Sequence, residues 1–285
     1  MKRKICAGIV TFNPDINLFT QCLDSIRKQV GRTYVFDNGS RNFDLLKMVL
    51  PDDVILISSD ENRGISKGLN ELCKAAEKDG YSWIVTMDQD SICVDNMVEI
   101  LSKHIDDSRI GIVAPRVEFR NNGELIYETR NDVSEVEEIR ACITSGSLTR
   151  INAWKQIGGF DEWMFIDHVD NEFCTHLIVE GYIVIRDNKA VLYQRAGEMK
   201  FFSLLGGKKI LLPYYSESRN YYICRNTVYY IRKYRKHINS KHEWMSFIYS
   251  QVIKVLFERN RIGSIRSTIK GIKDGKRKIQ RDSDY

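Results

Sequence analysis

The segment Trp83–Ser91, with the sequence WIVTMDQDS, decides the fold prediction for this chain. Its first part, Trp83–Met87, is an apolar run rich in β-branched residues, which is typical of a buried strand. The run ends in Asp88 and Asp90, and ligands of open α/β sheets bind at the carboxyl ends of strands. Alternation along an extended chain would place both carboxylates on the same side. Two neighbouring carboxylates repel each other unless a divalent cation lies between them, so the segment predicts a metal site; a polar turn after a strand is the simpler alternative.

Strands and helices alternate through the first third of the sequence. We expect strands at Ile5–Phe12, Thr33–Phe36, Val54–Ile57 and Trp83–Met87, and helices from near Pro14, after Gly64 and over Asn96–Ile105. This βαβ series predicts a mainly parallel sheet flanked by helices. Further strands are expected at Ile110–Val117, Ile183–Ile185 and Ala190–Tyr193, and helices at Ile151–Ile157 and Val169–Glu180. The charged stretch Glu118–Glu138 predicts loops and edge strands of undefined order.

Polar residues follow three of these strands. Thr11 and Asn13 end the first, Asp37 ends the second, and Asp88 and Asp90 end the fourth. Polar side chains at successive strand ends can line one cleft of nucleotide size. The chain has neither GxGxxG nor GxxxxGK[ST], which argues against dinucleotide-binding and P-loop proteins. For residues 37–40 alone, a turn chosen for its backbone angles is the favoured interpretation.

The composition is that of a globular protein with one large core, or with one core and an appendage. The chain has 285 residues and seven cysteines, which are scattered and never spaced as CxxC, so we expect reduced cysteines packed in the core. The run Ile5–Phe12 follows a basic start but is too short for a signal peptide and is better interpreted as a strand. No apolar segment reaches the ~20 residues of a membrane span.

Charge divides the chain into two parts. Residues 1–198 carry 23 Lys and Arg against 32 Asp and Glu, a net charge of −9, whereas residues 199–285 carry 20 against 6, a net charge of +14. Three basic helical stretches are expected after Ser216, with apolar residues over Trp244–Phe257 and at Ile262, Ile265, Ile269 and Ile272. Such helices favour an anionic membrane surface. A helical pair packed on the domain is the alternative, and the acidic cleft argues against nucleic acid.

Seven segments carry a family resemblance. They are Val10–Pro14 (VTFNP), Val35–Ser40 (VFDNGS), Glu61–Asn70 (ENRGISKGLN), Thr86–Ser91 (TMDQDS), Thr144–Ser147 (TSGS), Ile157–Cys174 (IGGFDEWMFIDHVDNEFC) and Ser218–Asn226 (SRNYYICRN). In this order and spacing, from Ile5 to about Tyr234, the chain resembles the family-two inverting glycosyltransferases of GT-A fold, in particular their bacterial rhamnosyltransferase branch.

The resemblance implies roles for individual residues. The expected contacts to the sugar nucleotide are Thr11, Asn13, Asp37, Asn62, Gly64, Asp88 and Arg225, with Arg219 as a further candidate for the diphosphate. Asp90, with Asp88, would bind Mg²⁺ or Mn²⁺ at the diphosphate. Asp170 would be the general base, since a proton must leave the acceptor hydroxyl. A helix N-terminus that merely favours acids is the structural alternative for Asp170.

The general base, the acceptor contacts and a third metal ligand each have more than one interpretation. Asp167 is the alternative base, and with Trp163 it is an expected acceptor contact, although core packing explains Trp163 equally well. The family has Arg where this chain has His176, and His where it has Gln194. Because Gln194 is a poor metal ligand, any third protein ligand is in doubt.

These expectations combine into one prediction. Residues 1–215 form a GT-A glycosyltransferase domain, and residues 216–285 form a basic helical extension. The chain transfers a sugar, expected to be L-rhamnose from dTDP-L-rhamnose, onto a lipid-linked saccharide acceptor, as a peripheral protein on the inner face of the cytoplasmic membrane. Alternatives are the same chemistry with a UDP-sugar, nucleotidyl transfer, or non-catalytic binding of a sugar nucleotide.

Overall fold

The computed structural model describes residues 4–121, 123–129, 134–195, 199–203, 209–213, 215–257 and 260–283. The chain forms two compact units. The first unit consists of Met1–Phe165 and Val169–Ala196, and the second consists of Ile166–His168 and Gly197–Tyr285.

A central sheet organises the first unit, and its described residues contribute ten strands. The strands are β1 (Ile5–Thr11), β2 (Thr33–Asn38), β3 (Val54–Ser59), β4 (Trp83–Asp88), β5 (Ile92–Cys93), β6 (Ile110–Asn121), β7 (Glu124–Glu128), β8 (Val136–Glu138), β9 (Leu148–Arg150) and β10 (Ile183–Arg195). Their order is β3-β2-β1-β4-β9-β6-β10-β5, with β7 beside β6 and β8 beside β10. The strands β3, β2, β1 and β4 are parallel, as are β6 and β10, and the short β9 runs antiparallel to both of its neighbours.

The register brings the polar strand ends together. Thr11 of β1 pairs with Asp37 of β2, and Val10 pairs with Asp88 of β4. The three strands therefore end at one edge of the sheet, where parallel α/β folds place their ligands.

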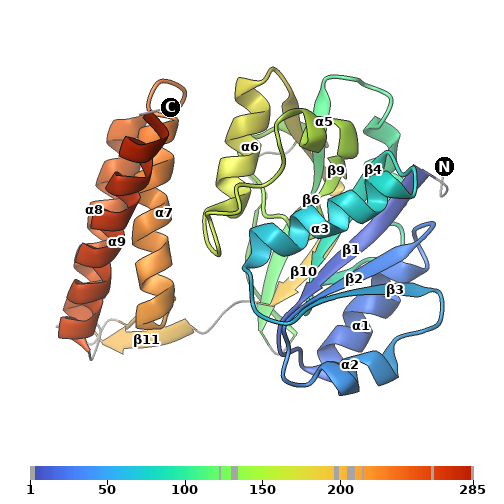
Figure 1. Cartoon of the computed structure of the whole chain (residues 1–285), viewed down its shortest axis with the longest axis horizontal. Coiled ribbons are helices and arrows are strands. Elements are labelled where there is room, and N and C mark those ends of the chain that lie inside the picture. Colours follow the sequence, from blue (N-terminus) through green and yellow to red (C-terminus); the bar gives the residue numbers. More distant parts are fainter. Residues whose placement is uncertain are drawn as a thin grey trace. The chain divides into compact units, whose positions relative to one another are not determined.

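Helices cover both faces of this sheet. They are α1 (Ile16–Arg27), α2 (Phe43–Val49), α3 (Ile65–Lys78), α4 (Met97–Leu101) with a 3-10 turn at Ser102–His104, α5 (Ile151–Gln156) and α6 (Val169–Val179). Side chains alternate along β1. Ile9 belongs to the same core as Phe19 of α1, whereas Gly8 faces α3, where an added Cβ would lie 3.0 Å from Leu72. Accordingly, α3 contacts the strands β1, β2 and β4, and it lies alongside β1 in Figure 1.

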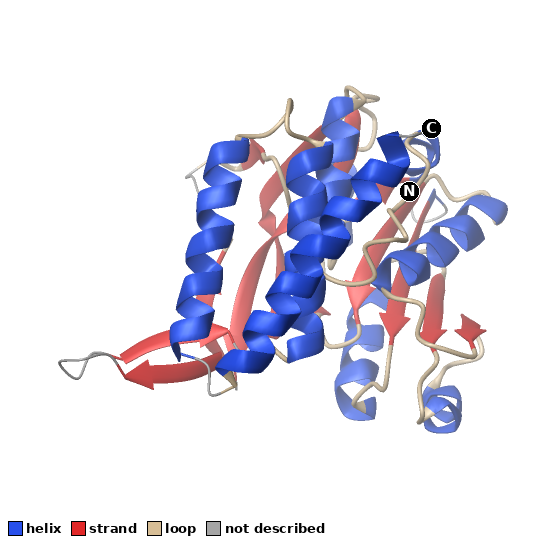
Figure 2. Cartoon of the chain, turned by 60° about the vertical axis from the view of Figure 1, so that its left-hand side comes forward, coloured by secondary structure: helices blue, strands red, loops and turns tan. Residues whose placement is uncertain are grey.

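The second unit is largely helical in its described part. It contains a hairpin of β11 (Met199–Ser203) and β12 (Lys209–Pro213), followed by α7 (Glu217–Lys233), α8 (Ser240–Phe257) and α9 (Arg261–Ser283). Figure 2 shows these helices side by side. Gly271 lets α9 approach α7 closely, because a Cβ there would lie 2.6 Å from the carbonyl oxygen of Tyr221.

The α/β fold with a mainly parallel sheet and C-terminal helices is confirmed. Some local predictions are wrong. The strands expected at Ile183–Ile185 and Ala190–Tyr193 are one strand, β10, whose register shifts between Asp187 and Val191. The helix expected over Asn96–Ile105 is the shorter α4 followed by a 3-10 turn. The boundary proposed at residue 215 remains a prediction.

Within the described residues, no helix is both long enough and apolar enough to cross a bilayer.

Candidate active site

A first group of polar residues, the Asp37 cluster, joins the ends of β1 and β2. The Thr11 hydroxyl lies 3.2 Å from Asp37 Oδ1, and Asp37 Oδ2 accepts a hydrogen bond from the Ser40 amide at 2.9 Å. Asn13, in a left-handed conformation at φ 46°, donates its amide to Ser40 Oγ and accepts from the Arg41 amide, both at 2.8 Å. Thr11 and Asp37 are buried. The turn after β2 and the loop after β1 therefore fix each other.

The start of α3 extends this cluster. The Asn38 amide donates to Asn62 Oδ1 and to the carbonyl of Gly64, each at 3.1 Å, and Asn62 Oδ1 accepts from the Gly64 amide at 2.9 Å. Gly64 has a φ of 87°, and a Cβ there would lie 2.6 Å from the carbonyl oxygen of Phe165. Only glycine satisfies both conditions, which explains this residue at the start of α3. Through Asn38, the residue that follows Asp37 in the chain, Asn62 and Gly64 thus lie beside the predicted residues of the Asp37 cluster.

A second group, the Asp88 cluster, forms where β4 ends. The Asp88 amide donates to Ser145 Oγ at 3.0 Å, and Asp88 Oδ2 accepts from Gln194 Nε2 at 3.0 Å. Ser91 lies 2.7 Å from Ser145 and also donates to Gln194 Oε1. Gln194 therefore orients the Asp88 carboxylate through its amide.

Gln89 connects the two clusters. Its side-chain Oε1 accepts from the Phe12 amide at 2.8 Å, and its Nε2 donates to the Phe12 carbonyl at 3.4 Å. Together these bonds clamp the residue after β1 to the residue after β4. Sequence reasoning assigned no role to Gln89, Ser91 or Ser145. The TSGS segment was the one signal that singled out Ser145.

Asp90 lies in a turn after β4, and not in the strand as expected. The strand β4 ends at Asp88, and residues 89–90 form a turn in which the Ser91 amide donates to the Asp88 carbonyl at 3.3 Å. Strand alternation therefore does not place Asp88 and Asp90 on one side, and that argument is wrong. Burial raises the pKa of the half-buried Asp90 carboxyl, while the positive charge of Arg195 opposes the shift.

The chemistry of Asp88 and Asp90 fits a hard divalent cation. Carboxylate oxygens are the ligands that Mg²⁺ and Mn²⁺ prefer, and a cation would offset the cost of burying Asp90. Across the described ranges of the chain, no group of three or more His, Cys, Asp or Glu could hold a metal ion by itself. The predicted block Tyr193–Glu198 is described only as far as Arg195.

The loop before α6 is held by α3. Asn70 of α3 donates to the Phe160 carbonyl and accepts from the Phe160 amide, both at 2.9 Å, and Ser66 donates to the Met164 carbonyl at 2.8 Å. Met164 is buried, while Trp163 is only half-buried. This arrangement fixes the backbone around Trp163 next to the Gly64 position.

Asp170 lies in the first turn of α6. Its Oδ1 accepts from the Asn171 amide at 2.9 Å, as expected for an acid at a helix N-terminus. Cys174, one turn further along α6, lies 3.7 Å from Cys142, so this end of α6 lies near the loop that leads to Ser145. His176, one turn beyond Glu172, places its Nδ1 3.9 Å from Glu172 Oε1.

Asp167 and the two predicted arginines belong to the second unit. Arg219 holds Asp167 through both carboxylate oxygens, at 3.0 to 3.2 Å. Arg225 is buried in α7, where its Nε donates to Asn226 Oδ1 at 2.9 Å and its guanidinium lies over the ring of Tyr222. The structure therefore shows contacts of both arginines with protein groups inside this unit.

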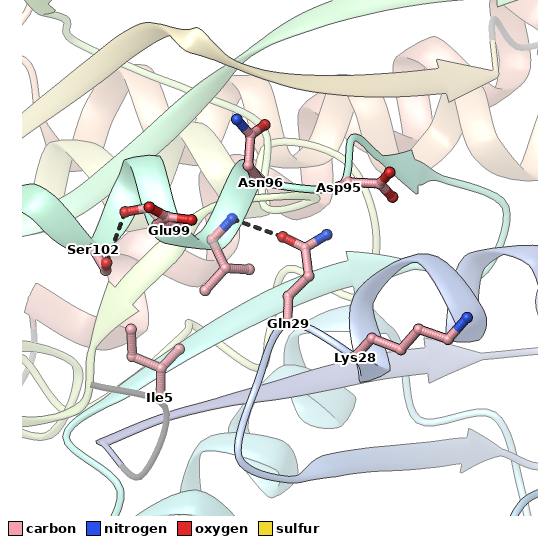
Figure 3. Close-up of a pocket in the computed structure, with 8 residues that line it drawn as sticks. Ile5, Lys28, Gln29, Asp95, Asn96, Glu99 and Ser102 are labelled. Carbon is pink, nitrogen blue, oxygen red and sulfur yellow. Dashed lines mark hydrogen bonds between the residues drawn. The ribbon is translucent and has the colours of Figure 1, made fainter.

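A cavity of about 330 Å³ lies elsewhere in the first unit. Figure 3 shows that Ile5, Gln29 and Asn96 are among the residues that line this cavity. Because Ile5 is the first residue of β1, the cavity lies at the amino end of that strand. Gln29 Oε1 accepts from the Val98 amide at 3.0 Å, and its Nε2 donates to the carbonyls of Ser25 and Val94. The side chain of Gln29 thus connects α4 to α1. The cavity is separate from the sheet edge that carries Asp88 and Asp90.

Solved structures share this fold. The chain matches GalNAc-T7 with UDP, GalNAc and Mn²⁺ at a TM-score of 0.60 and 12% identity, covering 80% of this chain and 47% of that one, so it spans about half of that protein's length. It matches S. aureus TarS 1–349 in complex with UDP-GlcNAc at a TM-score of 0.56 and 15% identity, covering 84% of this chain and 69% of that one. The fold is therefore that of the GT-A glycosyltransferases.

Sequence relatives then give the family. The chain is 26% identical over 303 residues to the dTDP-rhamnosyl transferase RfbF of Shigella flexneri, covering 98% of this chain and 97% of that protein. The model of Glycosyl transferase family 2 matches residues 6–166. The protein belongs to glycosyl transferase family 2, which confirms the predicted family and its enzymatic class.

Proposed function

We propose that this glycosyltransferase moves L-rhamnose from dTDP-L-rhamnose onto a hydroxyl of a lipid-linked saccharide, with inversion at the anomeric carbon. The observation that carries the proposal is the linked Asp37 and Asp88 clusters at one sheet edge, in a chain that matches RfbF over nearly its whole length. The name of that relative supports the donor, and the clusters support a nucleotide-sized site.

The donor nucleotide is assigned to the Asp37 cluster. Thr11 and Asp37 are already paired and buried, and the turns around Asn13 and Asn62 are fixed by hydrogen bonds. A preorganised polar wall loses little conformational freedom when it binds a base and ribose. Asp37 is therefore the proposed contact to the ribose or base. Gly64 has no side chain and leaves room for the nucleotide beside it.

The diphosphate is assigned to the Asp88 and Asp90 edge. A bound Mg²⁺ or Mn²⁺ would neutralise charge that develops on the leaving diphosphate. Asp90 would hold it, while Gln194 and Ser145 orient Asp88 beside it. We keep Arg225 as a proposed diphosphate contact, although its Nε already donates to Asn226.

Asp170 is the proposed general base. Its carboxylate removes the proton from the acceptor hydroxyl while the oxygen of that hydroxyl bonds to the anomeric carbon. The bond from that carbon to the diphosphate oxygen breaks, and dTDP leaves from the opposite face. Arg219 binds both oxygens of Asp167, which favours Asp170 over Asp167 for this role. Trp163 and Asp167 remain proposed contacts to the acceptor sugar.

The acceptor is proposed to be presented at an anionic membrane surface. Met245, Ile248, Tyr249, Val252 and Leu256 are exposed at helical spacing on α8. On α9, the exposed apolar residues Ile265 and Ile269 are each followed by a cation, namely Arg266 and Lys270, whereas Ile272 packs against the core of this unit. Helices that combine exposed apolar residues with basic ones bind the headgroup region of anionic bilayers.

A UDP-sugar is the second candidate donor. TarS 1–349 was solved with UDP-GlcNAc, and GalNAc-T7 with UDP. Both sugar nucleotides present a pyrimidine, a ribose-type sugar and a diphosphate, so the clusters would suit either.

The test is the release of nucleoside diphosphate from a panel of sugar nucleotides, with lipid-linked saccharides as acceptors and Mg²⁺ or Mn²⁺ present. We expect dTDP release from dTDP-L-rhamnose, with inverted anomeric configuration of the product by NMR. Release from UDP-sugars alone would select the second candidate, and a product of retained configuration would contradict the base mechanism.

A further inference from the structure

Two cysteines of the first unit lie in direct contact. The Sγ atoms of Cys142, in the loop before β9, and Cys174, on α6, are 3.7 Å apart. The chain positions are 32 residues apart, so the tertiary fold brings them together. The Ser147 hydroxyl, which donates to the Ile143 carbonyl at 2.6 Å, lies 3.5 Å from Cys142 Sγ.

The two thiols are unequal. A hydrogen bond from Cys174 lowers the pKa of the Cys142 thiol, and the Ser147 hydroxyl and the charge of Arg186 act in the same direction. The same hydrogen bond, together with burial, raises the pKa of the Cys174 thiol. The charge of Asp170 raises the pKa of both. Burial opposes the lowering at Cys142. Since the thiolate is the reactive form and Cys142 is the less buried of the two residues, we take Cys142 as the nucleophile of the pair.

Access distinguishes this pair from the other cysteines. Cys142 is partly exposed, whereas Cys6, Cys22, Cys73, Cys93 and Cys224 are buried. We therefore expect a small oxidant to reach Cys142 before the other thiols, with Cys174 beside it as the resolving thiol.

We propose that Cys142 and Cys174 form a redox-active dithiol, which a peroxide converts to a disulfide and a thiol reductant restores. The Cys142 thiolate attacks one peroxide oxygen, breaks the O–O bond and becomes a sulfenic acid, releasing water or an alcohol. The Cys174 sulfur then attacks the Cys142 sulfur, and the sulfenic oxygen leaves as water. Two thiols and one peroxide thus give one disulfide, with the peroxide as the two-electron acceptor.

The disulfide would displace groups around the acidic edge. A disulfide requires sulfur atoms about 2.05 Å apart, so the sulfurs must approach by more than 1 Å from their present 3.7 Å. On one side, Cys142 lies in the loop that carries Ser145, whose hydroxyl accepts a hydrogen bond from the Asp88 amide. On the other side, Cys174 follows Asp170 by one helical turn of α6. Oxidation therefore ties the proposed base to the loop that holds Asp88.

Turnover falls on oxidation, and this part rests on the proposed function. Displacement of catalytic groups by about 1 Å can lower the rate on the order of 10²-fold. We expect at least about a tenfold fall in dTDP release, reversed by dithiothreitol.

The experiment treats the reduced full-length protein with hydrogen peroxide, alkylates the remaining thiols, and maps peptides without reduction by mass spectrometry. The expected result is a peptide pair linked through Cys142 and Cys174, which dithiothreitol separates. Alkylated free thiols at both positions, or over-oxidised Cys142 beside a free Cys174, would overturn the proposal. This readout needs no turnover, so it stands even if the proposed transferase reaction fails.

Cysteine variants test whether the Cys142–Cys174 disulfide causes the loss of turnover. C142A and C174A should retain the turnover of the reduced enzyme and lose its peroxide sensitivity, whereas C224A should remain sensitive. If the disulfide forms but turnover is unchanged, the coupling to the acidic edge is wrong.

Discussion

Gln194 Nε2 donates a hydrogen bond to Asp88 Oδ2 at 3.0 Å, and its Oε1 accepts from Ser91. The residue that replaces the expected histidine therefore acts through its amide on a carboxylate. This arrangement orients Asp88 and anchors β10 to the end of β4. Burial raises the pKa of the Asp90 carboxyl, so a bound cation would stabilise its charged form.

The proton acceptor can be tested at two neighbouring acids. Asp170→Asn keeps the shape of the side chain but cannot take a proton, so kcat should fall about 10²–10⁴-fold with little change in donor affinity. Steady-state kinetics and direct donor titration measure the two effects. Asp167→Asn is the matched control and should lower kcat by a smaller factor, because Asp167 is already paired with Arg219. The reverse order would make Asp167 the base.

Membrane binding can be tested on α8. Ile248→Ser combined with Val252→Ser removes two exposed apolar side chains, and binding to anionic liposomes at low salt should fall severalfold while donor binding is retained. Liposome sedimentation measures it. Met48→Ser, on an exposed position of α2, should have no effect. Wild-type protein that does not bind anionic liposomes at low salt would contradict the membrane proposal.

The Gly64 contact predicts a position-specific loss of stability. Gly64→Ala adds a Cβ at φ 87°, 2.6 Å from the Phe165 carbonyl, and should lower the free energy of unfolding by about 1–3 kcal/mol and weaken donor binding. Gly80→Ala is the control, since Gly80 has a similar φ of 79° but open space around it. Urea unfolding of both variants separates backbone strain from the contact. Equal losses would show that Phe165 contributes nothing.

His168 predicts a pH dependence of stability. Burial lowers its pKa to about 4 from 6.5, and the charge of Asp167 only partly opposes this. Thr227 donates to the Ile223 carbonyl and lies 2.7 Å from His168 Nε2, so the imidazole is held neutral with its proton on Nε2. The unfolded chain binds the proton first, so the free energy of unfolding should fall as the pH drops from 6.5 towards 4.

The loss between pH 7 and pH 5 should be on the order of 1–2 kcal/mol. His168→Gln should show a smaller loss over the same range in urea unfolding. An identical pH profile for variant and wild type would contradict this account of His168.

The sequence predicts the sheet edge well because apolar runs of β-branched residues mark buried strands. Thr33–Phe36 and Trp83–Met87 are such runs, and their polar ends meet through the parallel register. Shorter or more polar elements escape this signal. Residues 148–150 form β9 through pairing with β4 and β6, and α2 begins at Phe43, after an Asn42 whose side chain makes no capping hydrogen bond.

Long-range side-chain bonds were also beyond sequence reasoning. Gln89 pairs with the Phe12 backbone 77 positions away, and Gln194 reaches Asp88 across 106 positions. Neither hydrogen bond is indicated by the residues that surround Gln89 or Gln194 in the sequence. The same limit explains the wrong argument for Asp90, because alternation holds only while the strand continues, and β4 ends at Asp88.

The most direct measurement is calorimetric titration of dTDP-L-rhamnose into wild type and Asp90→Asn, each with and without Mn²⁺. We predict that Mn²⁺ strengthens binding to the wild type by at least about tenfold, and that Asp90→Asn loses this gain while keeping its melting temperature. Asp95→Asn, an exposed acid five positions further on, should behave as wild type. Binding of equal strength with and without Mn²⁺, or an Asp90→Asn variant with the full metal effect, would contradict the proposed site.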